Sequence, residues 1–465
     1  MARRRVAIGY DRRMANIAPR ALLADLFHTA VAAADPMVAV PGFLPDVPKG
    51  RTVVVGAGKA SARMALAFEQ AWKGELSGVV VTGYGHGEPC ERIRVLEAAH
   101  PVPDEAGLRA SNALLAAVGG LERDDLVVAL ISGGGSALLP APPPGLTLAD
   151  EQALNGQLLK SGLAIGEMNL LRRQLSLIKG GGLARAVGPA RLVTLVISDV
   201  PGDDPAHVAS GPTIPGLGTA AEALALAERA GLPLTPAILA HLRTAILPGT
   251  VGRCRQDDVV HVLASAALSL NAAARRCREH YGLECEILSD AVEGEARHVG
   301  AEHARLARER QARLSSEGRP ILLLSGGETT VTVAQDAGWG GRNTEFAMAL
   351  GLGLTGSTNI HALAADTDGL DGASGGAGAY VDSGTVARLA NGGVDGEGAL
   401  AAHDTGSSFA RIGDLFVTGP TRTNVNDFRA IWVGPAAATG SSARLGRKAG
   451  SAPSLHPDTS ALEVP

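Results

Sequence analysis

The stretch "VVVGAGKASARMA", Val53 to Ala65, decides the fold that we predict for this chain. Its β-branched residues indicate a buried strand, its glycines a tight turn, and the residues after them a helix. Such a strand–turn–helix unit is typical of α/β domains, in which ligands bind at the carboxyl ends of the strands. The turn is therefore a loop for a dinucleotide, a loop for ATP, or a tight turn without a ligand.

Short apolar runs of the same kind recur along the chain and alternate with helical segments such as residues 61–73, 106–117 and 269–281. The runs read "TVVVGAG", "SGVVVTGYG", "DLVVALISGGG", "LVTLVISDV", "VVHVLA", "ECEIL", "ILLLSGG" and "IHALAAD". This alternation predicts mostly parallel sheets that are covered on both faces. We predict an α/β fold of two domains, each with a mostly parallel, Rossmann-like sheet flanked by helices.

A polar segment, "TVGRCRQDDV", interrupts this pattern and indicates a domain boundary near residues 235–260. We predict an N-terminal extension over residues 1–17, a first domain over 18–250 and a second domain over 251–435. Residues 436–465 have a low-complexity composition, which predicts a disordered tail.

The composition limits the partners of the protein. A net charge of −5 argues against a nucleic-acid coat, and no apolar stretch is suited to cross a membrane. The basic start "MARRRVAIGYDRRM" lacks the apolar region of a secretory signal, and a transit peptide stays open. The four cysteines form no C-x-x-C pair, which is typical of reduced thiols. We expect a cytoplasmic protein that binds small molecules; the sequence leaves a homodimer open.

The opening stretch fits neither of the two common nucleotide motifs. A Walker A loop requires Gly where this chain has Val53, and Ser or Thr where it has Ala60. A dinucleotide loop requires a third Gly or Ala where Ser61 stands, and an acid at the end of the next strand, which "GVVVTGYGHGE" lacks there.

Two cations follow glycine-rich turns at predicted helix starts, Lys59 and Arg342. A cation at this position opposes the helix dipole by roughly 0.3–1 kcal/mol. Two such cases indicate a bound anion, although both side chains are also long enough to reach solvent. The turns Ser132–Ser136 and Ser325–Gly327 present further backbone N–H groups that suit phosphate oxygens.

Acidic residues stand at the ends of two predicted strands. Asp199 is followed by Asp203 and Asp204, and Asp366 by Asp368 and Asp371. An aspartate at a strand end holds Mg²⁺, accepts a proton from a hydroxyl, or caps the next helix. Two histidines in nearby loops, His100 and His207, either face the same site or are structural. Glycine turns, cations and strand-end acids together indicate phosphoryl transfer.

Nine motifs in order resemble the glycerate 2-kinases whose C-terminal part is the MOFRL domain. They read "GAGKASARMA", "HPVPDEAG", "SGGGSALL", "LSLIKGGGLA", "ISDVPGDDPAHVASGPT", "LLSGGETTVTV", "GGRNTEFAMAL", "ADTDGLDGASGGAGAYVD" and "TNVND". The resemblance covers roughly residues 18–433. It implies ATP-dependent phosphorylation of D-glycerate at its 2-hydroxyl with Mg²⁺, in a cleft between two α/β domains.

The same resemblance assigns roles to individual residues. It implies that Lys59 and Arg342 are catalytic and bind the substrate, that Asn424 contacts the substrate, and that Asp199 and Asp366 hold the metal. It implies a nucleotide- or phosphate-binding role for the residues of two glycine loops, Ser132, Gly133, Gly134, Gly135, Ser136, Ser325, Gly326, Gly327 and Glu328.

The chain departs from the family in one loop. The late motif of the family usually reads T-G-T-N-V-N-D, and here Arg422 replaces the first Gly. If that position requires a positive φ, Arg422 strains the loop, which weakens the assignment of Asn424.

Two alternative functions stay open at this stage. One is a hydroxypyruvate reductase, which requires a nicotinamide site. The other is a non-catalytic protein that binds glycerate or a nucleotide. The sequence does not decide between 2- and 3-phosphorylation.

Overall fold

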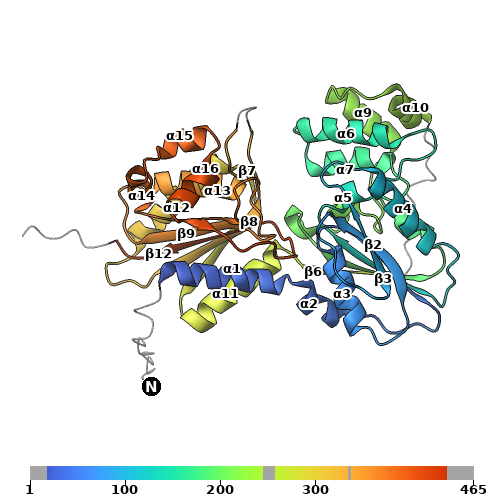
Figure 1. Cartoon of the computed structure of the whole chain (residues 1–465), viewed down its shortest axis with the longest axis horizontal. Helices are drawn as coiled ribbons and strands as arrows, with labels where there is room; N and C mark the ends of the chain where they lie inside the picture. The colour runs from blue at the N-terminus through green and yellow to red at the C-terminus, as the bar shows by residue number, and fades with distance from the viewer. Residues whose placement is uncertain (1–17, 245–256, 334–336, 437–465) are drawn as a thin grey trace, which may run out of the picture.

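The computed structural model describes residues 18–244, 257–333 and 337–436, which form two α/β domains side by side (Figure 1). The predicted extension over residues 1–17 lies outside the described residues, as does the predicted tail from residue 437 onward. In the described part, no single helix is long and apolar enough to cross a bilayer, and one bent pair, Pro19–Ala33 with Pro36–Phe43, passes by length and composition only.

The first domain contains a six-stranded sheet in the order β3-β2-β1-β4-β5-β6. Every neighbouring pair in it is parallel, as predicted. The two central strands are buried along their whole length, which explains their continuous apolar sequences. The strands are β1 (Thr52–Ala57), β2 (Ser77–Gly83), β3 (Ile93–Ala98), β4 (Leu126–Ser132), β5 (Arg191–Ile197) and β6 (Val259–Ala264).

Helices cover both faces of this sheet and extend beyond it. One face packs against α4 (Glu105–Ala117), α5 (Gly135–Leu138), α8 (Gly182–Ala186) and η4 (Val208–Ser210). The other packs against α2 (Pro36–Ala39), η2 (Val40–Phe43) and α3 (Ser61–Ala71). A separate apolar cluster, at the upper right of Figure 1, joins α6 (Leu148–Lys160), α7 (Ile165–Gln174), α9 (Ala220–Arg229) and α10 (Pro236–Thr244).

The second domain also has a six-stranded sheet, in the order β11-β10-β9-β12-β8-β7. Only the pair β7–β8 is parallel, and the other four pairs are antiparallel. The expectation of a mostly parallel sheet is therefore correct for the first domain and needs correction here. The strands are β7 (Glu284–Glu295), β8 (Ile321–Thr330), β9 (Ile360–Asp366), β10 (Gly378–Asp382), β11 (Leu415–Phe416) and β12 (Asp427–Val433).

The antiparallel pairing has a local cause. The connection from β9 to β10 contains no helix, whereas a parallel neighbour requires a longer crossover. The strand β12 then enters between β8 and β9 in the opposite direction. Helices α1 (Pro19–Ala33) and α11 (Ala266–Tyr281) cover one face of the sheet. The other elements are α12 (Ala296–Arg313), α13 (Arg342–Gly353), α14 (Thr385–Asn391), α15 (Gly396–Ala401), α16 (Thr405–Arg411) and, in the first domain, η3 (Pro201–Asp203).

Two segments pack in a different domain from the one to which the predicted bounds assign them. Helix α1 buries Leu26 and Phe27 against Phe428 and other core residues of the second domain. Strand β6 pairs with β5 in the first domain, and the predicted boundary at 250/251 lies outside the described residues. We therefore propose to place β6 in the first domain and α1 in the second.

Candidate active site

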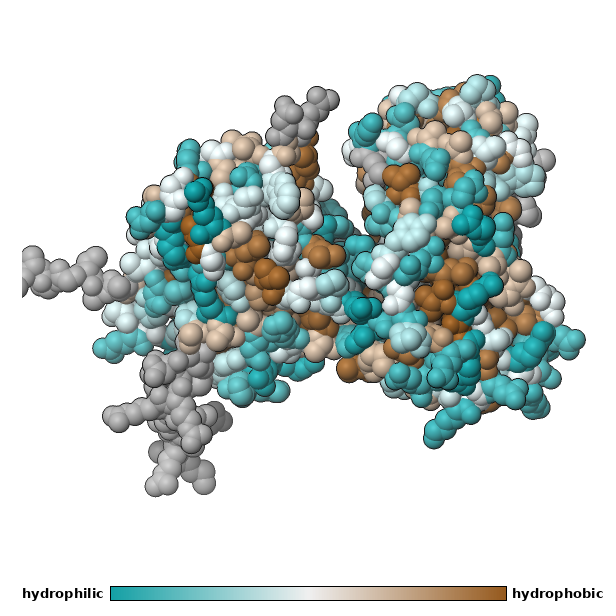
Figure 2. All heavy atoms as spheres, in the orientation of Figure 1, coloured by the Kyte–Doolittle hydropathy of each residue, from teal (hydrophilic) through white to brown (hydrophobic). Residues whose placement is uncertain are grey.

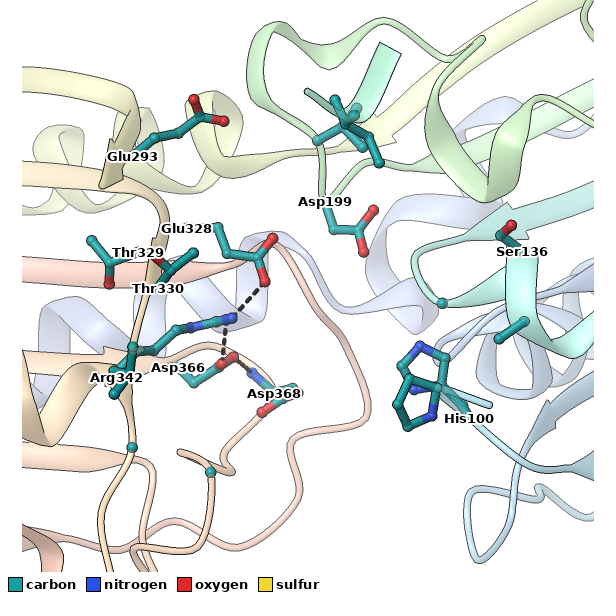
Figure 3. Close-up of a pocket in the computed structure, with 18 of the residues that line it drawn as sticks. His100, Ser136, Asp199, Glu293, Glu328, Thr329, Thr330, Arg342, Asp366 and Asp368 are labelled. Carbon is teal, nitrogen blue, oxygen red and sulfur yellow. Dashed lines mark hydrogen bonds and ion pairs between the residues drawn. The ribbon is translucent and has the colours of Figure 1, made fainter. Parts of the chain in front are cut away.

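A cavity of about 1310 Å³ lies between the two domains and is lined by residues of both. The space-filling view shows the corresponding notch between the lobes (Figure 2). The carboxyl ends of β1, β4 and β5 reach it from one side, and those of β8 and β9 from the other. In Figure 3, His100, Ser136 and Asp199 of the first domain face Glu328, Arg342, Asp366 and Asp368 of the second.

In the turn after β1, four successive backbone N–H groups are already hydrogen-bonded to protein acceptors, and we call this turn closed. Gly58 has φ +140°, and a Cβ there would lie 2.1 Å from the Ser132 hydroxyl oxygen, so glycine is required. Its N–H groups already have protein acceptors: Gly58 N with Val81 O, Lys59 N with Gly133 O, Ala60 N with Ser132 Oγ and Ser61 N with Gly58 O. None of these four groups is left for a phosphate, and the turn offers a ligand the side chain of Lys59 instead.

Lys59 points into the cavity and forms an ion pair with Asp368 of the second domain, at 3.2 Å. Burial disfavours the charged ammonium, but the carboxylates of Asp368 and Asp366 outweigh it and raise the pKa of Lys59. Lys59 is therefore a cation at neutral pH, and it links the two domains.

The turn after β4 differs from the turn after β1. Its N–H groups donate to no backbone acceptor in the described part of the chain, and we call this turn open. Gly134 has φ +80°, and a Cβ on Gly133 would lie 1.6 Å from the Asp199 carboxylate. In the described part of the chain, the N–H groups of Gly133, Gly134, Gly135 and Ser136 donate to no other backbone group. Gly134 and Ser136 line the cavity, whereas the buried Ser132 accepts a hydrogen bond from Ala60 N and supports the neighbouring turn.

The predicted turn at Ser325–Gly327 is wrong in its geometry, because these residues lie inside strand β8. They pair with β12, and Gly327 (φ +112°) lies so close to a bulge in β7 that a Cβ would be 2.2 Å from Val292 N. The Ser325 hydroxyl is buried beside the His303 ring. The glycines thus permit close packing of two strands, and of the four residues predicted here, Ser325 to Glu328, the cavity lining includes only Glu328.

Arg342 begins α13 and is surrounded by carboxylates. Its Nε donates to Asp427 at 2.8 Å, and its two terminal nitrogens pair with Asp366 at 2.7 Å and Glu328 at 2.5 Å. Burial opposes the charge, but these three carboxylates hold the pKa of Arg342 above its ordinary value. Figure 3 draws the pairs with Glu328 and Asp366 as dashed lines.

A buried layer beneath Arg342 fixes its position. Asp427 also accepts hydrogen bonds from Asn343 and from the fully buried Arg429. Asp371 accepts the N–H groups of Asn343 and Thr344, at 2.8 and 2.9 Å, and so caps α13. Burial raises the pKa of Asp371 to about 6 against these hydrogen bonds.

Asp199 follows β5, lines the cavity and has no cation within ion-pair distance among the described residues. Burial and the charge of Glu328 raise the pKa of Asp199 to about 6, although Lys59 lowers it. Its backbone oxygen accepts a hydrogen bond from Asn426, at 2.5 Å. Asp366, by contrast, forms an ion pair with Arg342, and burial raises the pKa of Asp366.

The structure places Asn424, for which the resemblance implies a substrate contact, outside the cavity lining. Asn424 is buried, lies outside the cavity lining, and accepts a hydrogen bond from Asn426 N at 3.1 Å. Next to it, Val425 is part of the apolar core of the first domain. This segment therefore joins the domains, and Asn426 and Asp427 are its residues nearest the site. The motif "TNVND" contained both, but nothing in it ranked them above Asn424.

Arg422 adopts the left-handed conformation, with φ +64°, as the family comparison of this loop suggested. Its guanidinium pairs with Glu88 of the first domain at 3.0 Å and is 44% exposed. The side chain therefore does not enter the cavity.

Both histidines that the sequence left open line the cavity. Burial and the nearby Lys59 lower the pKa of His100 to about 4, so its imidazole is neutral at physiological pH. The ring of His207 lies beside Asn169 in the wall of the cavity.

Fold and site together define a class: a two-domain α/β protein whose cleft gathers cations and carboxylates from both sides, as phosphoryl transfer requires. Residues 22–243 match the domain of unknown function DUF4147, and residues 321–427 match the MOFRL family. A protein of Agrobacterium vitis that carries the provisional name hydroxypyruvate reductase is 49% identical over 421 residues, which cover 90% of this chain and 95% of that protein.

Glycerate kinases match over a similar length. The D-glycerate 2-kinase of Thermotoga maritima is 36% identical over 408 residues, which cover 87% of this chain and 96% of the relative. The crystal structure of glycerate kinase from the same organism superposes with a TM-score of 0.80 at 34% identity, and covers 89% of this chain and 99% of that one. The chain belongs to the glycerate kinase family that contains the MOFRL domain.

Proposed function

We propose that this protein is a glycerate 2-kinase, which transfers a phosphoryl group from ATP to the 2-hydroxyl of D-glycerate and releases ADP and 2-phosphoglycerate. The observation that carries the proposal is the meeting of Lys59 and Arg342, from opposite domains, in one cavity. Phosphoryl transfer depends mainly on positioning and on compensation of negative charge, which two such cations supply. The names of the relatives in T. maritima support the same acceptor.

The two cations share the work of binding the reactants. Lys59 and Arg342 compensate the charge on the transferring phosphoryl group and orient the glycerate carboxylate. Each is kept charged by acids that lie beside it, so neither loses its proton when substrate enters. Lys59 and its partner Asp368 come from different domains, so their ion pair spans the cleft in which the two reactants would meet.

Asp199 is suited to receive the proton of the substrate hydroxyl or to hold Mg²⁺. Among the described residues, no group of three or more His, Cys, Asp or Glu side chains is placed to hold a metal ion. Mg²⁺ nevertheless binds through one or two carboxylates together with substrate phosphates, and Asp199 has a carboxylate without a cation partner. Asp366 fits this role less well because it pairs with Arg342. Bound Mg²⁺ would compensate charge on the phosphates of ATP.

The open turn Gly133–Ser136 is the best-supported part of the predicted phosphate site. Its N–H groups are free of backbone partners and lie at the carboxyl end of β4, next to β1. In the strand order 3-2-1-4-5-6, the direction of the sheet order reverses at this point, and ligands bind there in open α/β sheets.

A hydroxypyruvate reductase is the second candidate, because a relative at 49% identity carries that name. The strand order of the first sheet is also that of dinucleotide-binding domains. The closed turn after β1 counts against it, because a dinucleotide pyrophosphate needs the N–H groups that are already bonded there. A non-catalytic binding protein is less well supported, because both cations and Asp199 line the cavity.

Two assays on the purified protein separate these functions. We expect release of ADP from ATP, Mg²⁺ and D-glycerate, and no consumption of NADH with hydroxypyruvate. The position of the phosphate in the product, read by NMR, decides between 2- and 3-phosphorylation. NADH consumption without ADP release would overturn the proposal in favour of the reductase.

We also propose a cytoplasmic location. The described cysteines, Cys90, Cys277 and Cys285, are free thiols, which is typical of a reducing compartment. A homodimer stays an open proposal that size-exclusion chromatography with light scattering would test.

A further inference from the structure

Three Lys or Arg side chains line the cavity in the described part of the chain, and the third is Arg172. It lies on α7, in the helical cluster above the first sheet. Its neighbours in the lining include Asn155 on α6 and Asn169 on α7.

Arg172 is held in place by neutral groups only. Its Nε donates to Asn155 Oδ1 at 3.0 Å, and its Nη1 to Asn169 Oδ1 at 3.4 Å. Both asparagines are buried. Because their amide oxygens are uncharged, they orient the guanidinium and do not neutralise its positive charge. Among the described residues no carboxylate lies within ion-pair distance of it, and the acid that influences it, Glu151, is already paired with the buried Lys179.

This contrasts with the other two cations of the cavity. Lys59 pairs with one carboxylate and Arg342 with three. Burial lowers the pKa of Arg172, but a guanidinium stays protonated in proteins. A partly buried cation without a counter-ion is unfavourable unless an anion joins it, and this one borders an open cavity.

A row of polar groups connects Arg172 with the open turn after β4. The Ser136 and Ser210 hydroxyls lie 2.9 Å apart, Ser210 donates to Asn169 at 2.8 Å, and Asn169 accepts from Arg172. At the Ser136 end of this row, the side chain of Lys59 packs against Gly134. The lining also includes three apolar side chains from the start of α7 and the residues just before it, Leu163, Ile165 and Met168.

We propose that Arg172 binds the polyphosphate chain of ATP, whose phosphates follow the row from Lys59 past the open turn, with the nucleoside over the apolar residues of α7. The inference rests on the proposed function, in which ATP is the phosphoryl donor. The length of the row favours the nucleotide over glycerate. Three successive hydrogen bonds separate Ser136 from Arg172, beyond the reach of a three-carbon acid held at Lys59.

The test compares ADP and D-glycerate as probes for the full-length protein. Arg172→Met keeps the aliphatic stem and removes the charge. We expect it to weaken ADP binding in calorimetry, and to raise the KM for ATP, by about 10- to 100-fold, as loss of a charge-assisted hydrogen bond does. The KM for D-glycerate should stay within about twofold, and Arg172→Lys should restore part of the ADP affinity.

A second variant leaves Arg172 in place and neutralises it. Asn155→Asp puts a carboxylate where the amide oxygen now accepts from Nε, so it should weaken ADP binding in the same direction as Arg172→Met. Arg229→Gln is the matched control, because Arg229 pairs with Glu167 on the outside of the same helical cluster and should leave both constants unchanged.

The outcomes decide between distinct alternatives. If Arg172→Met or Asn155→Asp raises only the KM for D-glycerate, Arg172 binds the acceptor and the inference is wrong. Unchanged constants for both ligands overturn it as well. If Arg172→Met does not fold, Arg172→Gln, which can still donate to an asparagine, decides the same comparison. Absence of ADP release by the wild type would refute the proposed function instead, and ADP binding by calorimetry would still test Arg172.

Discussion

At the scale of single residues, Lys59 owes its importance to its position between two domains. Its backbone is fixed by the closed turn, and its side chain by Asp368 across the cleft. We expect Lys59→Ala to lower kcat/KM for ADP release by about 10²–10³-fold, the usual effect of removing one group that stabilises transition-state charge. Lys49→Ala, at an exposed position outside the cavity, is the control. A loss below about fivefold would contradict the assigned role.

Asp199 gives the reaction a predictable pH dependence. Burial and Glu328 place its pKa at about 6, so it is ionised at neutral pH and takes up a proton as the pH falls through 6. We expect kcat/KM to fall about tenfold per pH unit below that value, because only the carboxylate accepts a proton or binds a cation. A rate profile between pH 5 and 8 measures this.

A variant tests whether Asp199 causes the fall in kcat/KM at low pH. Glu328→Gln removes a negative charge that raises the pKa of Asp199, so the pH at which kcat/KM begins to fall should be lower in this variant. If that pH does not change, the fall is due to another group, such as Asp371, whose pKa is also about 6.

At the scale of elements, the turn after β4 and the tip of β5 are built against each other. A Cβ on Gly133 would overlap the Asp199 carboxylate at 1.6 Å. We therefore expect Gly133→Ala to displace Asp199 and to lower kcat by at least about tenfold, since small displacements of a reacting group cost about this much or more. Gly156→Ala in α6 has free space around it and should keep full activity, with a slight gain in stability. Equal activity of the two variants would contradict this packing.

Contacts between neighbouring elements explain why two predictions were wrong, the turn at Ser325–Gly327 and the mostly parallel second sheet. The sequences "SGGGS" and "SGGE" look alike, but one forms an open turn and the other lies within a strand. Glycine permits both a positive φ in a turn and the close approach of a neighbouring strand, and only the neighbour decides which applies. The second sheet likewise became mixed because β12, the last strand, entered between β8 and β9.

At the scale of the whole molecule, residues 421–426 tie the two domains together. Thr423 donates to Ala34 O at 2.7 Å, Val425 packs in the first domain, and Asn426 holds the backbone of Asp199. Arg422 adds an ion pair to Glu88 at the cost of a left-handed backbone. The left-handed backbone costs about 1–2 kcal/mol and an exposed pair returns at most about 1 kcal/mol.

Arg422 is therefore tolerated rather than favourable. Glycine removes the strain but also the pair, and it adds freedom to the unfolded chain. We expect Arg422→Gly to change unfolding stability by no more than about 1 kcal/mol and to keep kinase activity. Arg422→Val, whose branched side chain opposes a positive φ, should be less stable than the wild type. The midpoints of urea unfolding compare the three proteins, and a large gain in activity for the glycine variant would show that Arg422 impairs the enzyme.

The sequence by itself determined the α/β class and the parallel first sheet, because apolar runs and glycine turns are local signals. The roles expected for Lys59, Arg342 and Asp199 came from the family resemblance. It also contained the motifs by which the family is identified. Only the tertiary structure decided that Lys59 N–H is bonded to Gly133, that Asn426 and Asp427 contact Asp199 and Arg342, and that Arg172 faces the cavity without a carboxylate. These facts depend on which distant segments meet, and a hydrogen bond or a missing counter-ion leaves no periodic trace in the chain.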